Sequence, residues 1–495
     1  MKQPDLLSIG FLIAAVIVVF FPVFHADYLY ADEAPQLWYF TKDLNFNTSV
    51  SQGRYLTYEI FSWLFSSIHT IHEVIHARLF SLFGWILCLP VWYFIIMRVV
   101  VKNGLPKLLG ACSLIYLISM PPFGISIGWS ACMELFIAYT AGLLSGYILY
   151  EGITCEGKIV HVSGTSIVLS ALLGIISLFT YQNGFGCFYI PFFIALVSSK
   201  RITKSTYVGA GISILIFIGY FLLFKYSVAV SHVGLSDRSD LAENPVNKLL
   251  FFFARPMTTA FHFTWLVNEQ SMTGFIVSIL LAAAWLVALF IKQKGKPLRE
   301  TIFYLSGLLV FLVLIYLPSL IVKENYSSNR TLLALNLAVF FLAAETIFSF
   351  IEQRRFRYIL SVCLCFLFLI NARYNFNKQF VQPVAAEFAE IEDFLDHNYG
   401  PGTKAVYFIR PGEDAFTKKY GIVQSWDEFG VPSTAKSWTP EPLLRQLIFE
   451  KTGNRQIAEN IIIKSWPDIG AFQKSEEIIS DSTLLIDVEK RGMNQ

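Results

Sequence analysis

Two adjacent carboxylates, Asp32 and Glu33, come directly after the first apolar run of the chain. A carboxylate can act as a general base, taking the proton of a hydroxyl group as that hydroxyl attacks an electrophile. The alternative is structural, because Asp is a leading helix-cap residue and acids are favoured in the first turn of a helix. Taken alone, the residue types leave both interpretations of Asp32 open.

Three cations are candidate ligands for a phosphate. Arg54 follows Gly53 at the expected start of a helix, and a guanidinium there can bind a phosphate with two parallel hydrogen bonds. Lys323 and Arg330 bracket a short polar loop between two apolar runs, where charges are costly unless they line a wet cavity. The alternatives are an interfacial arginine on lipid headgroups and cations that snorkel to the surface.

A further set of polar residues suits sugar hydroxyls, because each offers a hydrogen-bonding group close to the ends of apolar runs. The same residues are equally compatible with turns and capped helix ends. The candidate sugar-binding or acceptor-binding residues are Tyr55, Glu134, Gln182, Asn183, Glu324 and Asn325.

A different motif, His-Glu-Val-Ile-His at 72–76, matches the H-E-x-x-H pattern of zinc proteases. Two histidines at i and i+4 on a helix can bind zinc, and the glutamate can activate water. No third ligand stands out in a later apolar run, and the 7 cysteines suggest neither a disulfide framework nor a metal site. A transporter is a further alternative, with Glu345 as its main intramembrane acid.

The elements that position these residues are expected to be membrane spans. The chain has 495 residues, of which 55% are hydrophobic and 15% charged, whereas soluble domains carry about 25% charged residues. A span needs about 20 mostly apolar residues. About eleven runs qualify, at 6–24, 77–97, 105–121, 132–150, 164–181, 184–199, 206–224, 272–291, 301–322, 331–351 and 357–372.

Loop charges predict the orientation of these spans. Lys and Arg are concentrated in alternate short loops, such as 98–107, 292–299 and 354–357, which marks that side as cytoplasmic. The N-terminus is then cytoplasmic. The segments predicted outside are 25–76, 121–131, 225–271, 323–330 and the tail from residue 373.

The sequence predicts two domains, a transmembrane domain over 1–372 and an extracytoplasmic soluble domain over 373–495. The tail holds half of the 36 acidic residues, a helical pattern at 383–396 and apolar strands at 404–409, 460–464 and 483–488. We therefore expect a small α/β domain there. The first outside loop, 25–76, predicts two surface helices at about 33–43 and 52–67, and the stretch 249–267 is broken by Arg255-Pro256.

The order of four short motifs resembles that of GT-C membrane glycosyltransferases, and within them the serotype-converting O-antigen glucosyltransferases of bacteria. The motifs are Tyr30-Ala31-Asp32-Glu33, Gln52-Gly53-Arg54-Tyr55-Leu56, Phe179-Thr180-Tyr181-Gln182 and Asn325-Tyr326-Ser327-Ser328-Asn329-Arg330. The resemblance implies a GT-C-like polytopic helical fold, with Asp32 as the catalytic acid/base residue and Glu33 as its neighbour or substitute.

The expected function is transfer of a hexose, with glucose as the favoured sugar, from a polyprenyl-phosphate donor to a lipid-linked glycan or O-antigen acceptor. The expected location is the bacterial inner membrane, with a periplasmic tail. A lipid flippase and a polyprenyl-phosphate sugar synthase are the expected functional partners, alongside membrane lipid. Neither nucleic acid nor a metal cofactor is predicted. The zinc protease and the transporter are the alternatives.

Overall fold

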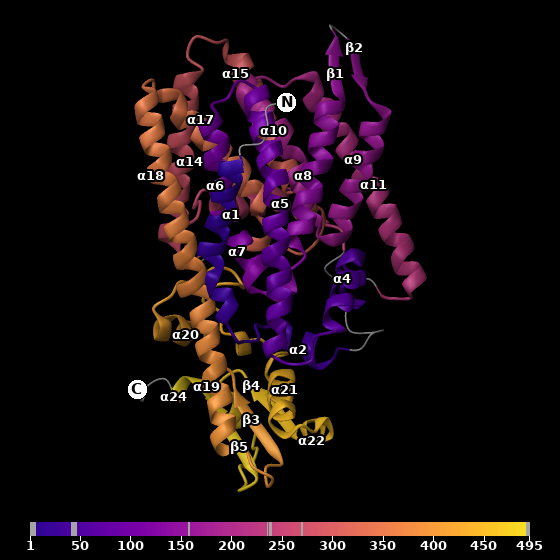
Figure 1. Cartoon of the computed structure of the whole chain (residues 1–495), viewed down its shortest axis with the longest axis vertical. Coiled ribbons are helices and arrows are strands. Elements are labelled where there is room, and N and C mark those ends of the chain that lie inside the picture. The colour runs from indigo at the N-terminus through magenta and orange to yellow at the C-terminus, as the bar shows by residue number, and fades with distance from the viewer. Residues whose placement is uncertain are drawn as a thin grey trace.

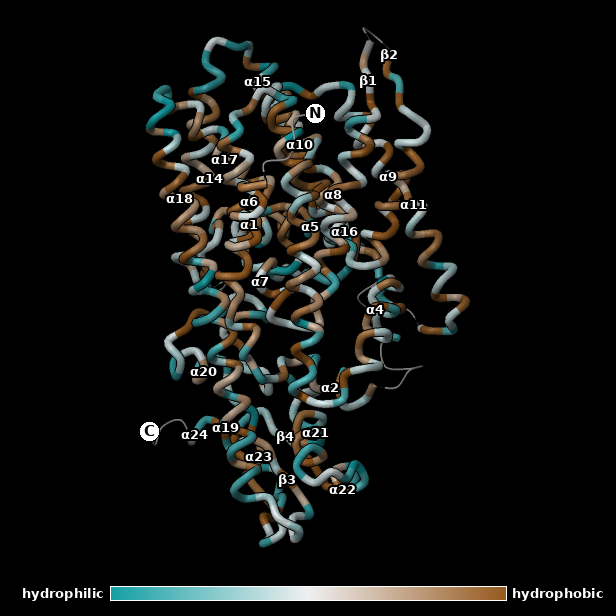
Figure 2. The backbone as a smooth tube through the Cα atoms, viewed as in Figure 1, coloured by the Kyte–Doolittle hydropathy of each residue, from teal (hydrophilic) through white to brown (hydrophobic). Residues whose placement is uncertain are grey.

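The computed structural model describes residues 6–40, 47–156, 159–234, 236, 240–268 and 271–491. A long bundle of helices forms one end of the molecule, and the chain after residue 398 forms a smaller unit at the other end (Figure 1). Hydrophobic residues dominate the bundle helices, and hydrophilic residues gather at the ends of the bundle and in the smaller unit (Figure 2).

Within the described residues, 8 helices are long and apolar enough to cross a membrane. The chain is therefore a polytopic helical membrane protein by length and composition. Large apolar side chains on these helices face outward, as they would toward lipid. Three of the eight segments are longer than the α-helix they contain: Leu6–His25 with α1 (Leu6–Phe20), His72–Lys102 with α5 (Ile75–Lys102) and Ser130–Gly152 with α8 (Leu135–Gly152). The others are Lys204–Ser231 (α11), Met272–Lys292 (α14), Leu298–Ile315 (α15), Leu333–Phe350 (α17) and Arg354–Asn398, which contains α18 and α19.

Among the described residues, three of the eleven expected runs do not form a single helix long and apolar enough to cross a membrane: 105–121, 164–181 and 184–199. In the run 105–121, α6 (Lys107–Ser119) ends just before Met120, whose backbone is extended, as is usual before a proline. The next helix, α7 (Pro121–Gly128), begins at Pro121 and is bent by 42° relative to α6. This bent pair gives a ninth span if it is counted as one. The run 301–322 changes direction at Tyr316, before the short helix α16 (Leu317–Ile321).

The run 184–199 is interrupted by a 3₁₀ helix, η4 (Gln182–Tyr189), which precedes the ten-residue α10 (Ile190–Ser199). The preceding run forms α9 (Gly164–Thr180), which has 17 residues. Glycines let η4 approach α8 closely: a Cβ on Gly146 would lie 1.9 Å from the Phe188 carbonyl oxygen. Such close approach is a common use of glycine.

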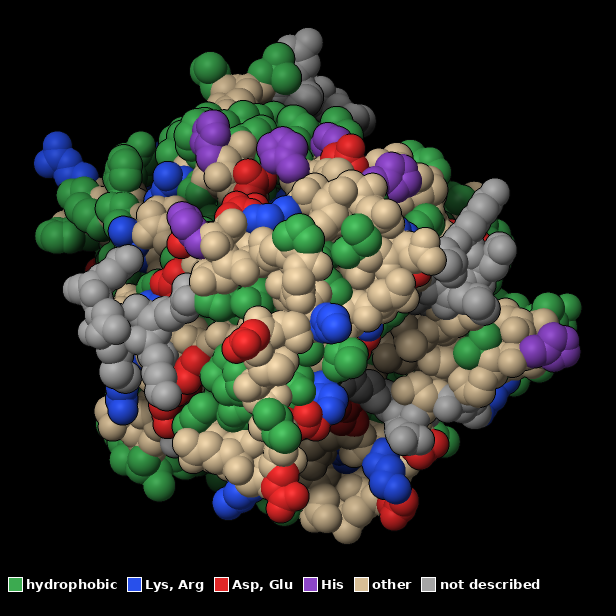
Figure 3. Space-filling model, turned by 90° about the horizontal axis from the view of Figure 1, so that it is seen from below, with side chains coloured by type: hydrophobic (Ala, Val, Ile, Leu, Met, Phe, Trp, Pro, Cys, Tyr) green, Lys and Arg blue, Asp and Glu red, His purple; other side chains and the backbone are tan. Residues whose placement is uncertain are grey.

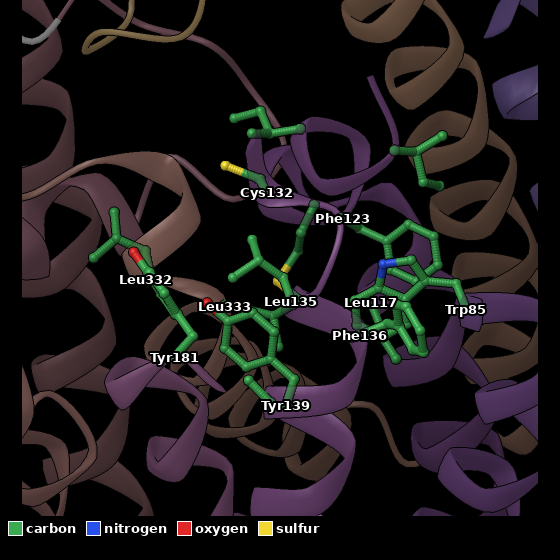
Figure 4. Packing of buried hydrophobic residues seen from close by; sticks show 14 of the residues in the cluster. Trp85, Leu117, Phe123, Cys132, Leu135, Phe136, Tyr139, Tyr181, Leu332 and Leu333 are labelled. Carbon is green, nitrogen blue, oxygen red and sulfur yellow. The ribbon is translucent and has the colours of Figure 1, made fainter. Parts of the chain in front are cut away.

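Around this contact the bundle core is aromatic. Figure 4 shows Tyr139 of α8 beside Tyr181, with Leu135 and Leu333 close by. Tyr116, Tyr139 and Trp85 are completely buried.

The first loop carries three short helices: α2 (Glu33–Trp38), α3 (Asn47–Ser51) and α4 (Tyr55–Phe65). The expected end of the first surface helix near residue 43 lies outside the described residues. In the stretch 249–267, α12 (Pro245–Ala254) and α13 (Pro256–Ala260) are separated at Arg255. A two-stranded hairpin, β1 (Ile153–Glu156) with β2 (Ile159–Val162), lies at the far end of the bundle and was not expected from the sequence.

The helix that leads into the tail does not stop at the expected domain boundary at residue 372. α18 (Arg354–Tyr374) continues through a π-helical stretch, Asn375–Val381, into α19 (Gln382–Asn398). The tail then forms a parallel three-stranded sheet in the order β4-β3-β5. Its strands are β3 (Ala405–Ile409), β4 (Ile462–Trp466) and β5 (Thr483–Asp487), and its helices are α20 (Glu413–Tyr420), α21 (Pro440–Thr452), α22 (Arg455–Asn460), α23 (Ile469–Lys474) and α24 (Val488–Arg491).

Candidate functional site

A cavity of about 530 Å³ lies where the first loop meets the bundle. Its wall combines polar side chains with an apolar side made by α11 and α16. A volume of this order is typical of a small-molecule site. Among the lining residues are Asp32, Gln52, Arg54, Thr57, Glu134, Tyr181, Gln182, Asn183, Phe217, Tyr220, Phe221, Phe224, Ser319, Glu324, Tyr326 and Arg330.

Asp32 occupies the N-cap position of α2, yet its side chain makes no capping hydrogen bond. It lines the cavity instead, and its Oδ1 accepts a 2.9 Å hydrogen bond from Nε1 of Trp438 in the tail. The preceding residue, Ala31, has a φ of 45°, a strained conformation for a non-glycine residue. The Ser433 hydroxyl accepts a hydrogen bond from the Ala31 amide at 2.9 Å, so the tail helps to hold this turn.

Glu33 faces away from Asp32, since it is completely buried and does not line the cavity. Its carboxylate accepts hydrogen bonds from the amides of Tyr30 (2.7 Å) and Ser130 (2.6 Å) and pairs with Arg78 at 2.6 Å. These contacts anchor the first loop to α5 and to the start of α8. The expected role of Glu33 as a neighbour or substitute for Asp32 in catalysis does not agree with this placement.

Arg54 reaches the cavity through a tight turn at Gly53, which has a φ of 79°. A Cβ at that position would lie 2.3 Å from the Tyr220 hydroxyl, so both the conformation and the space require glycine. The same hydroxyl donates to the Gly53 carbonyl at 3.1 Å, and the side-chain amide of Gln182 donates to the Gln52 carbonyl at 2.7 Å. The turn is thereby fixed against η4 and α11.

The Arg54 guanidinium lies over the Tyr181 ring at 4.6 Å, and its Nε donates to Gln182 at 3.3 Å. Within the described part of the chain, no carboxylate forms an ion pair with Arg54. The positive charge of Arg54 is therefore held by neutral groups at the cavity wall. This is a suitable arrangement for binding an anion.

Arg330 is held differently, by two acids from the tail. Its guanidinium lies 3.3 Å from Asp427 and 3.8 Å from Glu428, and it also contacts the Tyr326 hydroxyl. Glu428 accepts hydrogen bonds from the amides of Asn329 (2.8 Å) and Arg330 (3.1 Å). Burial raises the pKa of Glu428 to about 7, with the neighbouring Asp427 adding to the rise. Asp427, which pairs with Arg330, offsets its charge before any ligand arrives.

The structure brings together most of the residues singled out from the sequence. Glu134, Gln182, Asn183 and Glu324 share the cavity with Asp32, Arg54 and Arg330. Three others do not line it: Tyr55 is 39% exposed, Lys323 pairs with Glu243 at 3.1 Å, and Asn325 is exposed.

Sequence reasoning singled out no residue of the tail for the site, and it did not select Thr57. Trp438 gave no signal, because one tryptophan among several in the tail is unremarkable. Asp427-Glu428 repeats the Asp-Glu pairing of the first loop, and Thr57 lies one helical turn after Arg54. The repeated Asp-Glu pair and the position of Thr57 were the signals that the sequence offered, although neither by itself indicates contact with the cavity.

The His-Glu-Val-Ile-His motif lies beside the tail, because the amide of the preceding Ile71 donates to Glu450 at 2.8 Å. Histidines gather along one side of the face at the tail end (Figure 3). His72 pairs with Asp27 at 2.9 Å, and Glu73 accepts hydrogen bonds from the amides of His69 (2.7 Å) and Thr70 (3.1 Å) at the start of the helix. Among the described residues, no group of three or more His, Cys, Asp or Glu side chains could hold a metal ion. These contacts favour a role in helix initiation.

Glu345, the acid that motivated the transporter alternative, lies near the opposite end of the bundle. It pairs with Lys292 at 2.5 Å, and both side chains are mostly buried. It does not line the cavity. Comparison with known proteins adds no assignment: no family model matches this chain, and a search of curated proteins finds no match.

Proposed function

We propose that this protein transfers a hexose from a polyprenyl-phosphate donor to a hydroxyl group of a lipid-linked glycan. The observation that carries the proposal is the cavity itself. It brings together the half-buried carboxylate of Asp32 and the cation of Arg54, which is held by neutral groups. Several hydroxyl-binding side chains lie beside them, next to an apolar wall. These are the groups that a base, a leaving phosphate, a sugar and a lipid chain would each require.

In the proposed reaction the acceptor hydroxyl attacks the anomeric carbon of the donor sugar. A new carbon–oxygen bond forms, and the bond between that carbon and the phosphate oxygen breaks. Asp32 takes the acceptor proton, and the polyprenyl phosphate leaves with the bonding electrons. Trp438, which donates to one carboxylate oxygen, leaves the other oxygen of Asp32 to accept this proton.

Arg54 is the favoured ligand for the leaving phosphate. Stabilising charge that develops on a leaving group is a major part of catalysis in such reactions. Arg330 is paired with Asp427, and Lys323 lies outside the cavity, so both contribute less to this role. Arg330 is better suited to holding the tail against the site.

The lipid part of the donor fits the apolar side of the cavity. Phe217, Phe221 and Phe224 recur along one side of α11, and all three line the cavity. The outer side of the same helix exposes large apolar residues such as Leu215 and Leu222, which are 67% and 65% exposed. A polyprenyl chain lying along α11 would therefore pass from the cavity into surrounding lipid.

The proposed location follows from the positive-inside rule. The loops rich in Lys and Arg lie at the hairpin end of the bundle (Figure 1). The cavity lies on the tail side, because its lining residue Asp32 contacts Trp438 of the tail. The cavity and the tail would then be periplasmic in a bacterial inner membrane. A flippase and a polyprenyl-phosphate sugar synthase would supply the donor on that side.

The test is to reconstitute the protein in liposomes with a polyprenyl-phosphate hexose and a lipid-linked oligosaccharide. Mass spectrometry should detect an acceptor one hexose heavier, together with free polyprenyl phosphate. Replacing Arg54 by Gln should abolish most of the product, whereas Lys323→Gln should have little effect. Movement of the donor across the bilayer without a new glycosidic bond would contradict the proposal and indicate a transporter.

A further inference from the structure

Glu134 is a buried carboxylate at the cavity wall whose hydrogen-bonding capacity is mostly unused. Glu134 is only 2% exposed, and it lines the cavity together with Asp32 and Arg54. Its Oε2 is buried and has no hydrogen-bond partner within the described part of the protein. Buried polar atoms are almost always paired, so such an oxygen requires an explanation.

The other carboxylate oxygen is also weakly bound. The Thr57 hydroxyl lies 3.4 Å from Oε1 of Glu134 but only 2.6 Å from the Thr180 carbonyl oxygen. A hydroxyl has a single proton, and the shorter contact is the stronger hydrogen bond. The carboxylate also interacts with the Glu134 backbone amide, so Oε2 is the acceptor atom that the described part of the protein leaves unused.

Structural roles do not account for this residue. Glu134 stands at the N-cap of α8, yet its side chain makes no capping hydrogen bond. Among the described residues, no cation lies within ion-pair distance of it, in contrast to the Arg78 partner of Glu33. An acid at the end of a membrane span is costly to retain, and such residues usually serve a binding site.

The surroundings indicate what Glu134 binds. A carboxylate accepts hydrogen bonds from hydroxyl groups or from an ammonium group. Arg54 and Arg330 both lie close enough to act on Glu134 electrostatically, and their positive charge would repel an ammonium. A neutral polyol is therefore the ligand class that fits.

We propose that Glu134 is a specificity-determining residue: its Oε2 accepts a hydrogen bond from one hydroxyl group of the transferred hexose. This inference rests on the proposed function. It assigns to Glu134 the recognition of the sugar, separate from the proton transfer at Asp32 and the phosphate binding at Arg54.

The experiment compares donors that differ by one hydroxyl group. The kcat/KM of transfer is measured for the polyprenyl-phosphate hexose and for its four monodeoxy analogues at positions 2, 3, 4 and 6. The wild type should reject one analogue by roughly 10- to 100-fold, the size of one hydrogen bond to a charged group. In Glu134→Ala, the ratio of kcat/KM for the hexose donor to kcat/KM for that analogue should fall toward unity. The same ratios for the other three analogues should stay unchanged.

Two further variants keep the result interpretable. Glu134→Gln preserves the size of the side chain and an acceptor oxygen, so it should keep part of the discrimination even if the alanine variant fails to fold. Glu59→Gln, on the exposed side of α4, is the matched control and should retain the wild-type pattern.

The possible failures are distinguishable. If both Glu134 variants are slower but discriminate as the wild type does, the inference is wrong and the proposed function stands. If the wild type transfers sugar from no polyprenyl-phosphate hexose, the proposed function fails, and the inference fails with it.

Discussion

Nε1 of Trp438 donates a 2.9 Å hydrogen bond to Oδ1 of Asp32, joining residues that are 406 positions apart. The tail is therefore part of the site, because it fixes the side chain that we propose as the base. The indole ring itself is 51% exposed, so this contact is not simply a consequence of core packing.

Replacing Trp438 by Phe should impair transfer while leaving the fold intact. Phe keeps the aromatic ring but cannot donate a hydrogen bond, and such a bond to a charged group contributes about 1.5–3 kcal/mol. We expect kcat/KM to fall by roughly 10-fold or more. Trp63→Phe, at a 65% exposed position on α4, is the control and should behave as the wild type. Equal activity of the Trp438→Phe and Trp63→Phe variants would show that the Trp438 hydrogen bond does not contribute to catalysis.

The buried pair of Glu33 and Arg78 should matter for stability. Both side chains are at most 1% exposed, and Glu33→Gln leaves the arginine without its charge partner. Breaking such a pair costs about 3–5 kcal/mol. Unfolding by SDS in mixed micelles would measure this loss.

The control for that experiment is Glu459→Gln, in an exposed i,i+4 pair with Arg455, which should change stability by about 0.5 kcal/mol or less. A Glu33→Gln variant as stable as this control would show that the pair does not anchor the first loop.

Glu428 should make the stability of the protein depend on pH. Burial raises its folded-state pKa from 4.5 to about 7, so the folded state holds its proton more tightly than the unfolded state. The contribution of Glu428 is complete below about pH 4.5 and is lost as the pH rises through about 7. The melting temperature should therefore fall less steeply from pH 5 to pH 8 in Glu428→Gln than in the wild type. Glu441→Gln, at a 47% exposed side chain, should keep the wild-type slope; an unchanged slope in Glu428→Gln would refute the assignment.

The packing of α8 against η4 should tolerate no side chain at Gly146. An alanine Cβ there would lie 1.9 Å from the Phe188 carbonyl oxygen, and overpacking of this kind costs about 1–3 kcal/mol. Gly211→Ala on α11 is the matched control, since nothing lies within 4 Å of its Cβ. There alanine should be neutral or slightly stabilising. Thermal unfolding in detergent compares the two, and equal melting temperatures would contradict the close contact.

The sequence predicts the helical membrane character well, because apolar runs of about 20 residues are typical of membrane-spanning helices. It predicts the breaks in those runs poorly. Pro121 bends one span, and the glycines near η4 permit a 3₁₀ helix where composition alone favours a straight span. Hydropathy averages over such local geometry, so it does not separate a full span from an interrupted one.

The site was partly predictable for a similar reason. Asp32, Arg54 and Gln182 could be placed on one side of the membrane from loop charges alone. The different surroundings of Asp32 and Glu33 could not be predicted from the sequence. They depend on the contact of Asp32 with the tail and on the contact of Glu33 with α5. The contacts of Trp438, Asp427 and Glu428 depend on tertiary packing that no local pattern encodes.

The most direct test of the account is the transfer rate of Asp32→Asn in reconstituted liposomes supplied with a polyprenyl-phosphate hexose and a lipid-linked glycan. Asparagine keeps the shape of the side chain and can still accept the Trp438 hydrogen bond, but it cannot take a proton. The account predicts a loss of at least about 100-fold in kcat, the usual contribution of a general base. Asp27→Asn, at a 57% exposed side chain in the same loop, should retain the wild-type rate. An Asp32→Asn protein that folds and transfers sugar at the wild-type rate would contradict the account.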